Sequence, residues 1–595
     1  MDKTPLIWAS GALREATTLL TAIWANGSAE SRERLVQSLL AGPPDELLTR
    51  VNEDERQLSR DRRIFDRLKV LEGVGDPPLD GRLRAELDRI EGGYPHWAAP
   101  EGERATFSTW SEFRLGPDTN FGVDDLAALS TDELISTLRD ETSLREGLLD
   151  SWKQFTETDP DAAIAILADM VATGDGGPDD VWERGLWGLR ESAKNPGRRD
   201  RIFDVMERIP DALMGLPSIA RASADLLEAA AGSRPSPTEH AAVWRLFDRT
   251  LTVLSGDEGN IQADGAHDAV THAINNALGN LAQAFFALLF ARSLKVWSKI
   301  PSDLRSRADA LLGVGVPSHR PARVIAAARL SYLFAVDPDW TLTNLIPSFD
   351  WEQDEVEASA VWQGYAWQPR IDEKLWPALR PYFVATFTPE RLLRVGEMAT
   401  SLAQLLMLVG IDFARDELPP DAVRDAIRAM TDELRSSALS WVVSFLAQPD
   451  EPEDEAAGKP PTKTADTIWK DRVSHWLPSV WPPEEALRSA ATSEQFAQIA
   501  IVLNENFPNA VDALSHFIVP LNAHYELHML ARSQHPDKHP RAVLKLISVL
   551  ADRDHLALDT RDLRQILERV RVADATVVNL ALFSELWNLA QVGMQ

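Results

Sequence analysis

The chain has 595 residues, enough for about four domains of ordinary size or for one extended helical array. Its 44% hydrophobic and 26% charged residues are close to the globular average, which excludes wholesale disorder and a fibrous repeat. The 91 acidic and 61 basic residues give a net charge of −30. A surface of that charge repels phosphate backbones and anionic lipids, so nucleic acids and membranes are disfavoured as partners.

The chain contains no cysteine, which excludes disulfides, thiolate metal sites and thiol nucleophiles and fits a reducing compartment. Residues 1–20 lack the uninterrupted apolar core of a signal peptide and run directly into an amphipathic helical pattern. We therefore expect no export signal and a cytoplasmic location.

The first expected region, residues 1–120, combines helical periodicity with an irregular stretch at 92–119 that is rich in glycine, proline and aromatic residues. The isolated rings of this stretch favour an ordered loop that its aromatic side chains hold in place. They are Tyr94, Trp97, Phe107, Trp110 and Phe113.

The second region, residues 121–447, has apolar residues at helical spacing almost throughout. Helix starts are marked by an acceptor or proline before a good helix former, because proline at the first helical position loses no hydrogen bond. These starts are Asp159-Pro160, Ser236-Pro237, Thr388-Pro389 and Pro419-Pro420. Glycine clusters, as at 313–315, are typical of the intervening helix ends.

The most apolar segment of this region is 273–291, AINNALGNLAQAFFALLFA. Its length approaches that of a membrane span, but three asparagines and one glutamine within it would be costly in lipid. We therefore predict a buried core helix and no membrane anchor.

Residues 448–464 form an acidic, proline-rich linker, and residues 465–595 form a C-terminal helical region. Within that region the pattern PxAVxxL begins at Pro508 and again at Pro540, a spacing typical of helix hairpins. Period-two runs typical of strands are almost missing. The predicted fold is all-α, a helix-hairpin, α-solenoid-like array in two or three subdomains.

No phosphate-binding loop, serine-hydrolase elbow, zinc-protease motif or EF-hand loop is present. We predict no catalytic residue, no metal site and no cofactor. The sharpest local candidate is His524 with His528, four apart on one helical face and with His516 upstream, but two imidazoles alone do not complete a zinc site.

Tryptophan is abundant, with 19 residues, and one concentration lies between 340 and 376. Large rings fill helix junctions or form binding surfaces, and several here precede proline or a turn, where they can line a groove. The predicted binding residues are Trp340, Trp351, Trp362, Trp367 and Trp376.

Three segments in the same part of the chain carry a resemblance to a known family. They are NNALGNLAQAFFALLF (275–290), VDPDWTLTNLIPSFDWE (336–352) and AVWQGYAWQPRIDEKLWPALRPYF (360–383). This succession resembles the helical C-terminal regions of bacterial sirtuin-type antiphage defence proteins, in which an NAD-cleaving domain precedes a helical array that regulates it and senses infection. The resemblance covers about a fifth of the chain and includes no catalytic residue. It implies a sensor or scaffold whose catalytic part is a separate polypeptide or is missing.

Two hypotheses follow. The first is a noncatalytic helical scaffold or sensor that binds a protein partner, such as a defence effector enzyme or a phage protein, through the tryptophans of 340–376. The alternative is a helical enzyme whose site is assembled from dispersed residues, with the histidines of 516–528 as its first candidates.

Overall fold

The computed structural model of the protein describes residues 7–8, 13–44, 56–74, 77–94, 97, 121–139, 145–172, 176–232, 241–256, 268–413, 417–448, 464–551 and 560–592. Within these residues the regular structure is helical, and the only strand-like feature is a single β-bridge between Leu521 and Ala551. The all-α helical array predicted from the sequence is confirmed.

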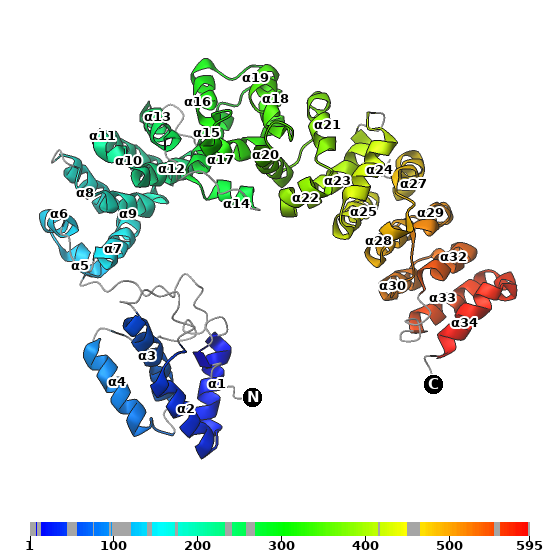
Figure 1. Ribbon diagram of the computed structural model, residues 1–595, viewed down its shortest axis with the longest axis horizontal. Coiled ribbons are helices and arrows are strands. Elements are labelled where there is room, and N and C mark those ends of the chain that lie inside the picture. The colour runs from blue at the N-terminus through cyan, green and yellow to red at the C-terminus, as the bar shows by residue number, and fades with distance from the viewer. Residues whose placement is uncertain are drawn as a thin grey trace, which may run out of the picture. The chain divides into compact units, whose positions relative to one another are not determined.

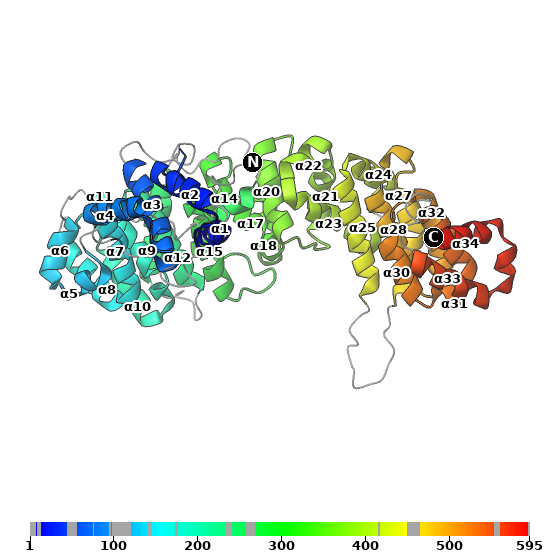
Figure 2. The same cartoon turned by 90° about the horizontal axis from the view of Figure 1, so that it is seen from below.

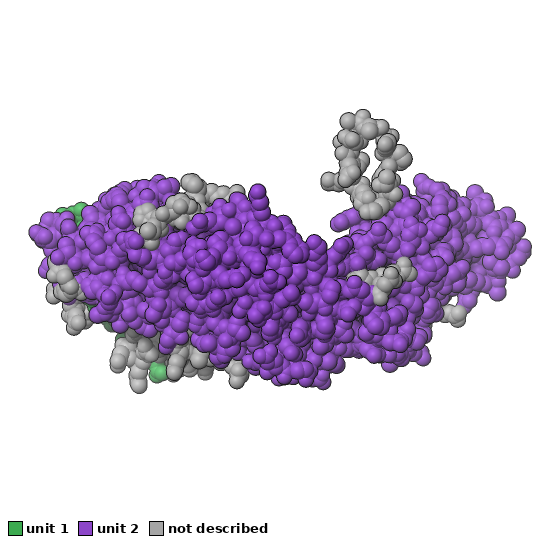
Figure 3. Space-filling model, turned by 90° about the horizontal axis from the view of Figure 1, so that it is seen from above, with its two compact units in different colours: residues 1–129, 140–151 green, residues 130–139, 152–595 purple. Residues whose placement is uncertain are grey.

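The chain divides into two compact units, which Figure 3 colours separately. Unit 1 comprises residues 1–129 and 140–151, and unit 2 comprises residues 130–139 and 152–595. Of the expected linker, only Gln448 and Thr464 are among the described residues.

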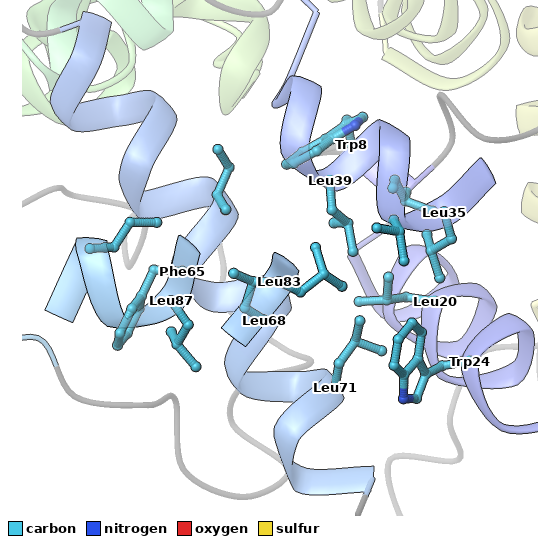
Figure 4. Packing of buried hydrophobic residues seen from close by; sticks show 14 residues of the cluster. Trp8, Leu20, Trp24, Leu35, Leu39, Phe65, Leu68, Leu71, Leu83 and Leu87 are labelled. Atoms are coloured by element: carbon cyan, nitrogen blue, oxygen red, sulfur yellow. The ribbon is translucent and has the colours of Figure 1, made fainter. Parts of the chain in front are cut away.

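Unit 1 is a small group of helices joined to the start of a further helix, α7 (Arg145–Thr158). Its helices are α1 (Leu13–Asn26), α2 (Ala29–Ala41), α3 (Arg56–Val74), α4 (Gly81–Gly93) and α5 (Val123–Ala128). The side chains that α1 to α4 share form one hydrophobic cluster, in which Leu68 and Leu83 are fully buried (Figure 4). Polar atoms close its edges: the Trp24 indole donates to the Pro77 carbonyl at 2.9 Å, and the Arg67 guanidinium lies 4.5 Å from the Trp8 ring.

Of the expected aromatic loop at 92–119, the structure describes 92–94 and Trp97. The rings of Tyr94 and Trp97 stack at 4.1 Å, and Trp97 also meets Phe65 edge-on at 5.5 Å. These two rings therefore pack on the core of unit 1.

Unit 2 contains the remaining helices, which follow one another in chain order (Figures 1 and 2). Its first half contains α6 (Thr131–Arg139), α8 (Pro160–Ala172), α9 (Asp179–Leu189), η5 (Ser192–Lys194), α10 (Pro196–Glu207), α11 (Asp211–Met214), α12 (Pro217–Gly232), α13 (Ala241–Ser255), α14 (Ala269–Ile274), α15 (Ala277–Ala291), α16 (Ser302–Leu312), η7 (Pro317–His319), α17 (Arg320–Ala327), α18 (Leu330–Val336), α19 (Pro338–Asn344), η8 (Ile346–Phe349) and α20 (Glu355–Trp367).

Its second half contains α21 (Trp376–Ala385), α22 (Pro389–Val395), η9 (Gly396–Met398), α23 (Ala399–Leu408), η10 (Val409–Phe413), α24 (Pro420–Ala429), α25 (Asp432–Ala447), α26 (Ala465–Ile468), η12 (Trp469–Val473), α27 (Ser474–Val480), η13 (Glu485–Leu487), α28 (Ala490–Ile501), α29 (Phe507–Leu514), η14 (Ser515–Phe517), α30 (His524–Arg532), α31 (His535–Lys538), α32 (Pro540–Leu550), α33 (Thr560–Ala573), η16 (Ala575–Asn579) and α34 (Ala581–Val592). Two of these segments, η10 and η12, are π-helical turns that pack against each other.

The predicted helix starts are confirmed wherever the structure describes them. Helices α8, α22 and α24 begin at Pro160, Pro389 and Pro420. At α22, the hydroxyl of Thr388 accepts a hydrogen bond from the Arg391 backbone N–H at 3.2 Å, so the residue before the proline caps the helix. The predicted start at Ser236-Pro237 lies outside the described residues.

The apolar segment 273–291 lies in the core, as predicted, but it does not form one helix. Chain direction changes at Asn276, whose side chain accepts from the Leu278 backbone N–H at 2.9 Å and caps α15. The rest of α15 is buried on most of its faces. Asn280 remains satisfied because its amide donates to the Asp225 carboxylate of α12 at 2.5 Å.

A different helical segment, 389–413, is long and apolar enough to cross a membrane, with a mean hydropathy of 1.4 over its most apolar 18 residues. Half of these 18 residues are buried within the protein, and the core helix of a protein can have the same length and composition.

Helices of unit 2 pack mainly on elements near them in the sequence. Helix α12 packs on α15, α17 on α20, α23 on α25, and α25 on α28. The last contact continues the packing across the expected linker. One crossing is especially close, because a Cβ at Gly364 of α20 would lie 2.3 Å from the Val324 carbonyl oxygen of α17.

We expect Gly364→Ala to destabilise unit 2 by about 1–3 kcal/mol, since backbone atoms of α17 must move to admit the added methyl group. The measurement is the thermal unfolding midpoint. Gly232→Ala at the end of α12 is the matched control, because no atom lies within 4 Å of its added Cβ. An unchanged midpoint for Gly364→Ala would contradict this crossing.

Candidate functional site

The structure places the five predicted binding tryptophans on four neighbouring elements of unit 2. They are Trp340 in α19, Trp351 after η8, Trp362 and Trp367 in α20, and Trp376 in α21. Four of them are at most 5% exposed, and Trp367 is partly buried. Four of these rings are therefore packed between helices and are not available to line an open groove.

Hydrogen bonds satisfy the indole N–H groups of Trp340 and Trp351, whereas the indole N–H of Trp376 is buried without a partner among the described residues. The Trp340 N–H donates to the Asp309 carboxylate at 2.7 Å, and the Trp351 N–H donates to the Thr386 hydroxyl at 2.9 Å. Buried indoles usually have such a partner, and the two partners here lie more than 30 residues away in the sequence.

The histidines do not converge. His528 Nδ1 lies 3.0 Å from an Asp562 carboxylate oxygen, whereas the His516 ring packs on Phe517. Across the described ranges, no three histidine or acidic side chains are grouped as metal ligands. The enzyme hypothesis therefore gains no site from these residues.

A small pocket with charged side chains in its wall lies among η7, α17, η8 and α20, with a volume of about 80 Å³. Arg320 and Arg323 line it together with Glu357, and all three are at least nine-tenths buried. Both oxygens of the Glu357 carboxylate accept hydrogen bonds from Arg323, at 2.5 and 2.8 Å. Ligand pockets commonly enclose about 300–1,000 Å³, so this space is too small for a substrate of ordinary size.

Arg323 has a structural task at this pocket. Its guanidinium donates to the carbonyls of Leu312, Gly313 and Val316 at 2.5 to 3.0 Å. Carbonyls at a helix C-terminus lack partners within the helix, and Arg323 supplies them at the end of α16. Its ion pair with Glu357 then fixes this helix end to α20.

A more distinctive feature is the loop of residues 292–299 between α15 and α16, here named the Trp297 loop. All of its residues except Leu294 are exposed, and Val296 and Trp297 retain 65% and 57% of their accessible surface. Phe290, at the end of α15, is 38% exposed beside it in the sequence. Exposed rings of this size are typical of protein-binding surfaces.

Backbone hydrogen bonds hold the Trp297 loop against the end of α18. The Trp297 N–H donates to the Ala335 carbonyl at 2.8 Å, and the Lys299 N–H donates to the Val336 carbonyl at 3.0 Å. These two carbonyls belong to the last turn of α18, where a helix leaves acceptors unsatisfied. The loop therefore serves as the cap of a neighbouring helix.

Asp337 completes this junction. Its side chain is fully buried and accepts hydrogen bonds from the backbone N–H groups of Ile300 at 3.0 Å and Trp340 at 3.3 Å. It also pairs with Arg305 of α16. Burial acts to raise the pKa of Asp337, but these hydrogen bonds and the Arg305 charge outweigh it and lower the pKa below its ordinary value.

The loop is held in a strained backbone conformation. Ser293, Trp297 and Lys299 have φ angles of 48°, 65° and 66°, in the left-handed region that side chains with a Cβ disfavour. Each such residue costs roughly 1–2 kcal/mol. Strain of this kind persists where neighbouring structure imposes it, and it is concentrated at functional sites.

The Trp297 ring also has a cationic neighbour. Lys374 Nζ lies 4.6 Å from the ring centroid, in the segment between α20 and α21. That segment is attached to the array, since the Arg370 carbonyl accepts hydrogen bonds from Ser331 and Tyr365, both at 2.9 Å. Two separately anchored segments thus meet at the exposed indole.

The Trp297 loop was not among the binding residues predicted from the sequence. A usable signal was present: RSLKVWSK contains three basic residues, no acidic residue and a tryptophan, and it directly follows the most apolar segment of an acidic chain. Helical periodicity does not report such a feature, because the loop belongs to no helix.

Comparisons with known proteins add no family to this description: no family model and no curated protein matches the chain. Among solved structures, the crystal structure of an engineered protein from the Northeast Structural Genomics Consortium is similar at 14% identity, over 79% of this chain and 97% of its own, with a TM-score of 0.24. A similarity of this size carries no argument about function.

We expect Asp337→Asn to lower the free energy of unfolding at pH 7 by about 1.5–3 kcal/mol, the contribution of hydrogen bonds to a charged group. Because the folded pKa is depressed, the contribution is present above the unfolded value of about 3.9 and is lost as the pH falls through the folded pKa. Urea unfolding at neutral and acidic pH measures this difference, which should shrink below about pH 4. The control Asp339→Asn, at an exposed carboxylate, should change little at either pH; a difference that grows with acidity would refute the assignment.

We expect Glu357→Gln to destabilise the protein by about 3–5 kcal/mol, since it leaves two buried arginines without their anion. Glu355→Gln, on the same helix but in a half-exposed pair with Arg394, should cost no more than about 1 kcal/mol. Equal unfolding midpoints for the two variants would show that the buried pair is not needed.

Proposed function

We propose that this chain is a noncatalytic helical scaffold or sensor that binds a protein partner, and that the Trp297 loop is part of its binding surface. The observation that carries the proposal is an exposed tryptophan held in a left-handed backbone by hydrogen bonds to a neighbouring helix. Stability alone does not favour this arrangement, because it exposes an apolar ring and stores strain. A binding role supplies a reason for both.

Preorganisation supports this role. A loop already fixed by the bonds of Trp297, Lys299 and Ile300 loses little freedom when a partner docks, so less of the binding energy is spent on ordering it. Tryptophan is also among the residues that most often dominate protein-protein binding energies.

The helix order of unit 2 supports an α-solenoid as the form of the scaffold. Successive helices pack on near neighbours in the sequence, as in a stack of repeats, and such stacks offer extended surfaces to partners. The cytoplasmic location stays a prediction. The defence setting, which the sirtuin-type resemblance implies, also stays a prediction.

The histidine-based enzyme remains the alternative, and no observation in the described residues favours it over the scaffold. His516 and His528 have separate neighbours, and the pocket at Glu357 is small. A structure-guided search for activity would therefore have no defined starting point.

Site-specific photocrosslinking tests the proposal. With a photoreactive residue at position 297, cells that produce the chain should yield a discrete adduct with one protein. The same residue at Leu393, which is 73% exposed in α22, should not. The partner, once identified and purified, should bind the full chain directly, and the absence of a specific adduct at 297 would count against the proposal.

Trp297→Gly then separates binding from folding. Loss of the cation–π contact costs about 0.5–1 kcal/mol, whereas relief of the left-handed strain returns roughly 1–2 kcal/mol. The unfolding midpoint should therefore stay near that of the wild type. Binding of the purified partner should weaken by about 30-fold or more, as expected for a dominant interface residue, and unchanged affinity would contradict the role of the loop.

A further inference from the structure

We propose that the Trp297 loop recognises an acidic segment of the partner protein that also carries aliphatic side chains. This inference rests on the proposed function and adds the chemistry of the partner to it. It is drawn from the charges, the apolar surface and the anchoring of the loop.

The loop has the opposite charge to the chain as a whole. Residues 292–299 contain Arg292, Lys295 and Lys299 and no acidic residue, while the chain carries a net charge of −30. All three cations are exposed. The acidic surface of the chain repels an anionic partner segment, whereas this local positive surface attracts it.

These cations are weakly committed to partners within the chain. Lys299 pairs with Asp339 at 3.7 Å and Arg292 pairs with Asp303 at 4.0 Å, both at exposed positions. Lys295 forms no ion pair within the described residues. Exposed pairs at such distances contribute little to stability, so a docking carboxylate can replace them.

Two lysines flank the exposed apolar residues of the loop in the sequence. Lys295, Val296, Trp297 and Lys299 are all exposed, and Lys374 lies over the Trp297 ring from the neighbouring segment. A partner segment that carries both acidic and aliphatic side chains matches this arrangement: its carboxylates reach the ammonium groups, and its aliphatic side chains cover Val296 and the indole. The loop backbone is fixed, so the spacing of these groups is set before the partner binds.

Acidic side chains beside the loop disfavour a nucleic acid as its partner. Asp303 and Asp339 lie beside the loop cations, and Glu373 is next to Lys374 in the sequence. A long phosphate backbone would meet these carboxylates and the acidic surface beyond them, whereas a short peptide can avoid both. The observations therefore favour a peptide segment over a polyanion.

Fluorescence anisotropy with the full chain and labelled peptides tests the proposal. The probes are a glutamate–leucine peptide, a serine–leucine peptide and a lysine–leucine peptide of equal length, together with a single-stranded oligonucleotide. We expect the glutamate–leucine peptide to bind the wild type at least about tenfold more tightly than the serine–leucine peptide, and its affinity to fall as salt rises.

Charge reversal at the loop supplies the decisive variant. Lys295→Glu with Lys299→Glu should weaken the glutamate–leucine peptide by at least about tenfold and should increase binding of the lysine–leucine peptide. Lys538→Glu with Lys545→Glu is the matched control, since it reverses two exposed lysines elsewhere in unit 2. The control should bind like the wild type, and unfolding midpoints of both double variants verify that they fold.

Three results would overturn the proposal. They are equal binding of the acidic and neutral peptides, equal loss in the loop and control variants, and tighter binding of the oligonucleotide than of the acidic peptide. None of these would remove a photocrosslinked partner at position 297, so the scaffold function can survive their outcome. Conversely, peptide binding without any crosslinked partner would support the preference of the loop for acidic segments and would contradict the scaffold function.

Discussion

The buried carboxylate of Asp337 receives hydrogen bonds from Ile300 and Trp340 and pairs with Arg305, and in this way it joins three separate pieces of chain. It begins α19, it holds α16, and it fixes the end of the Trp297 loop. Without this anion, the backbone N–H of Ile300 would be buried without an acceptor, and the loop would lose the anchor at its C-terminal end. The exposed surface that we propose for binding therefore depends on a side chain that a partner does not touch.

Short helices explain why such polar junctions recur. Each helix end leaves backbone groups unsatisfied, and unit 2 consists of many helices of moderate length. The structure satisfies these ends with donors from neighbouring elements. The Arg323 guanidinium donates hydrogen bonds to the carbonyls that end α16, and backbone N–H groups of the Trp297 loop donate to those that end α18. Neighbouring helices are thus connected by hydrogen bonds as well as by apolar contacts, which fixes their relative positions more specifically than packing alone.

The Trp297 loop illustrates a division between stability and binding. Other tryptophans of unit 2, such as Trp351 and Trp362, stabilise the array by burial. Trp297 instead remains exposed on a backbone conformation that costs free energy. Proteins retain such local costs where function requires them, provided that the surrounding structure is stable enough to impose the conformation.

The sequence by itself determined the all-α class, the helix starts at Pro160, Pro389 and Pro420, and the burial of 273–291, because periodicity and capping are local properties of neighbouring residues. It could not decide which aromatic residues are exposed. Trp351 can be buried because the Thr386 hydroxyl accepts a hydrogen bond from its indole N–H. Trp297 is held at the surface because its backbone N–H caps the end of α18. Both outcomes depend on residues more than 30 positions away. Only the tertiary structure brings those residues into contact, and so only the tertiary structure located the candidate binding surface.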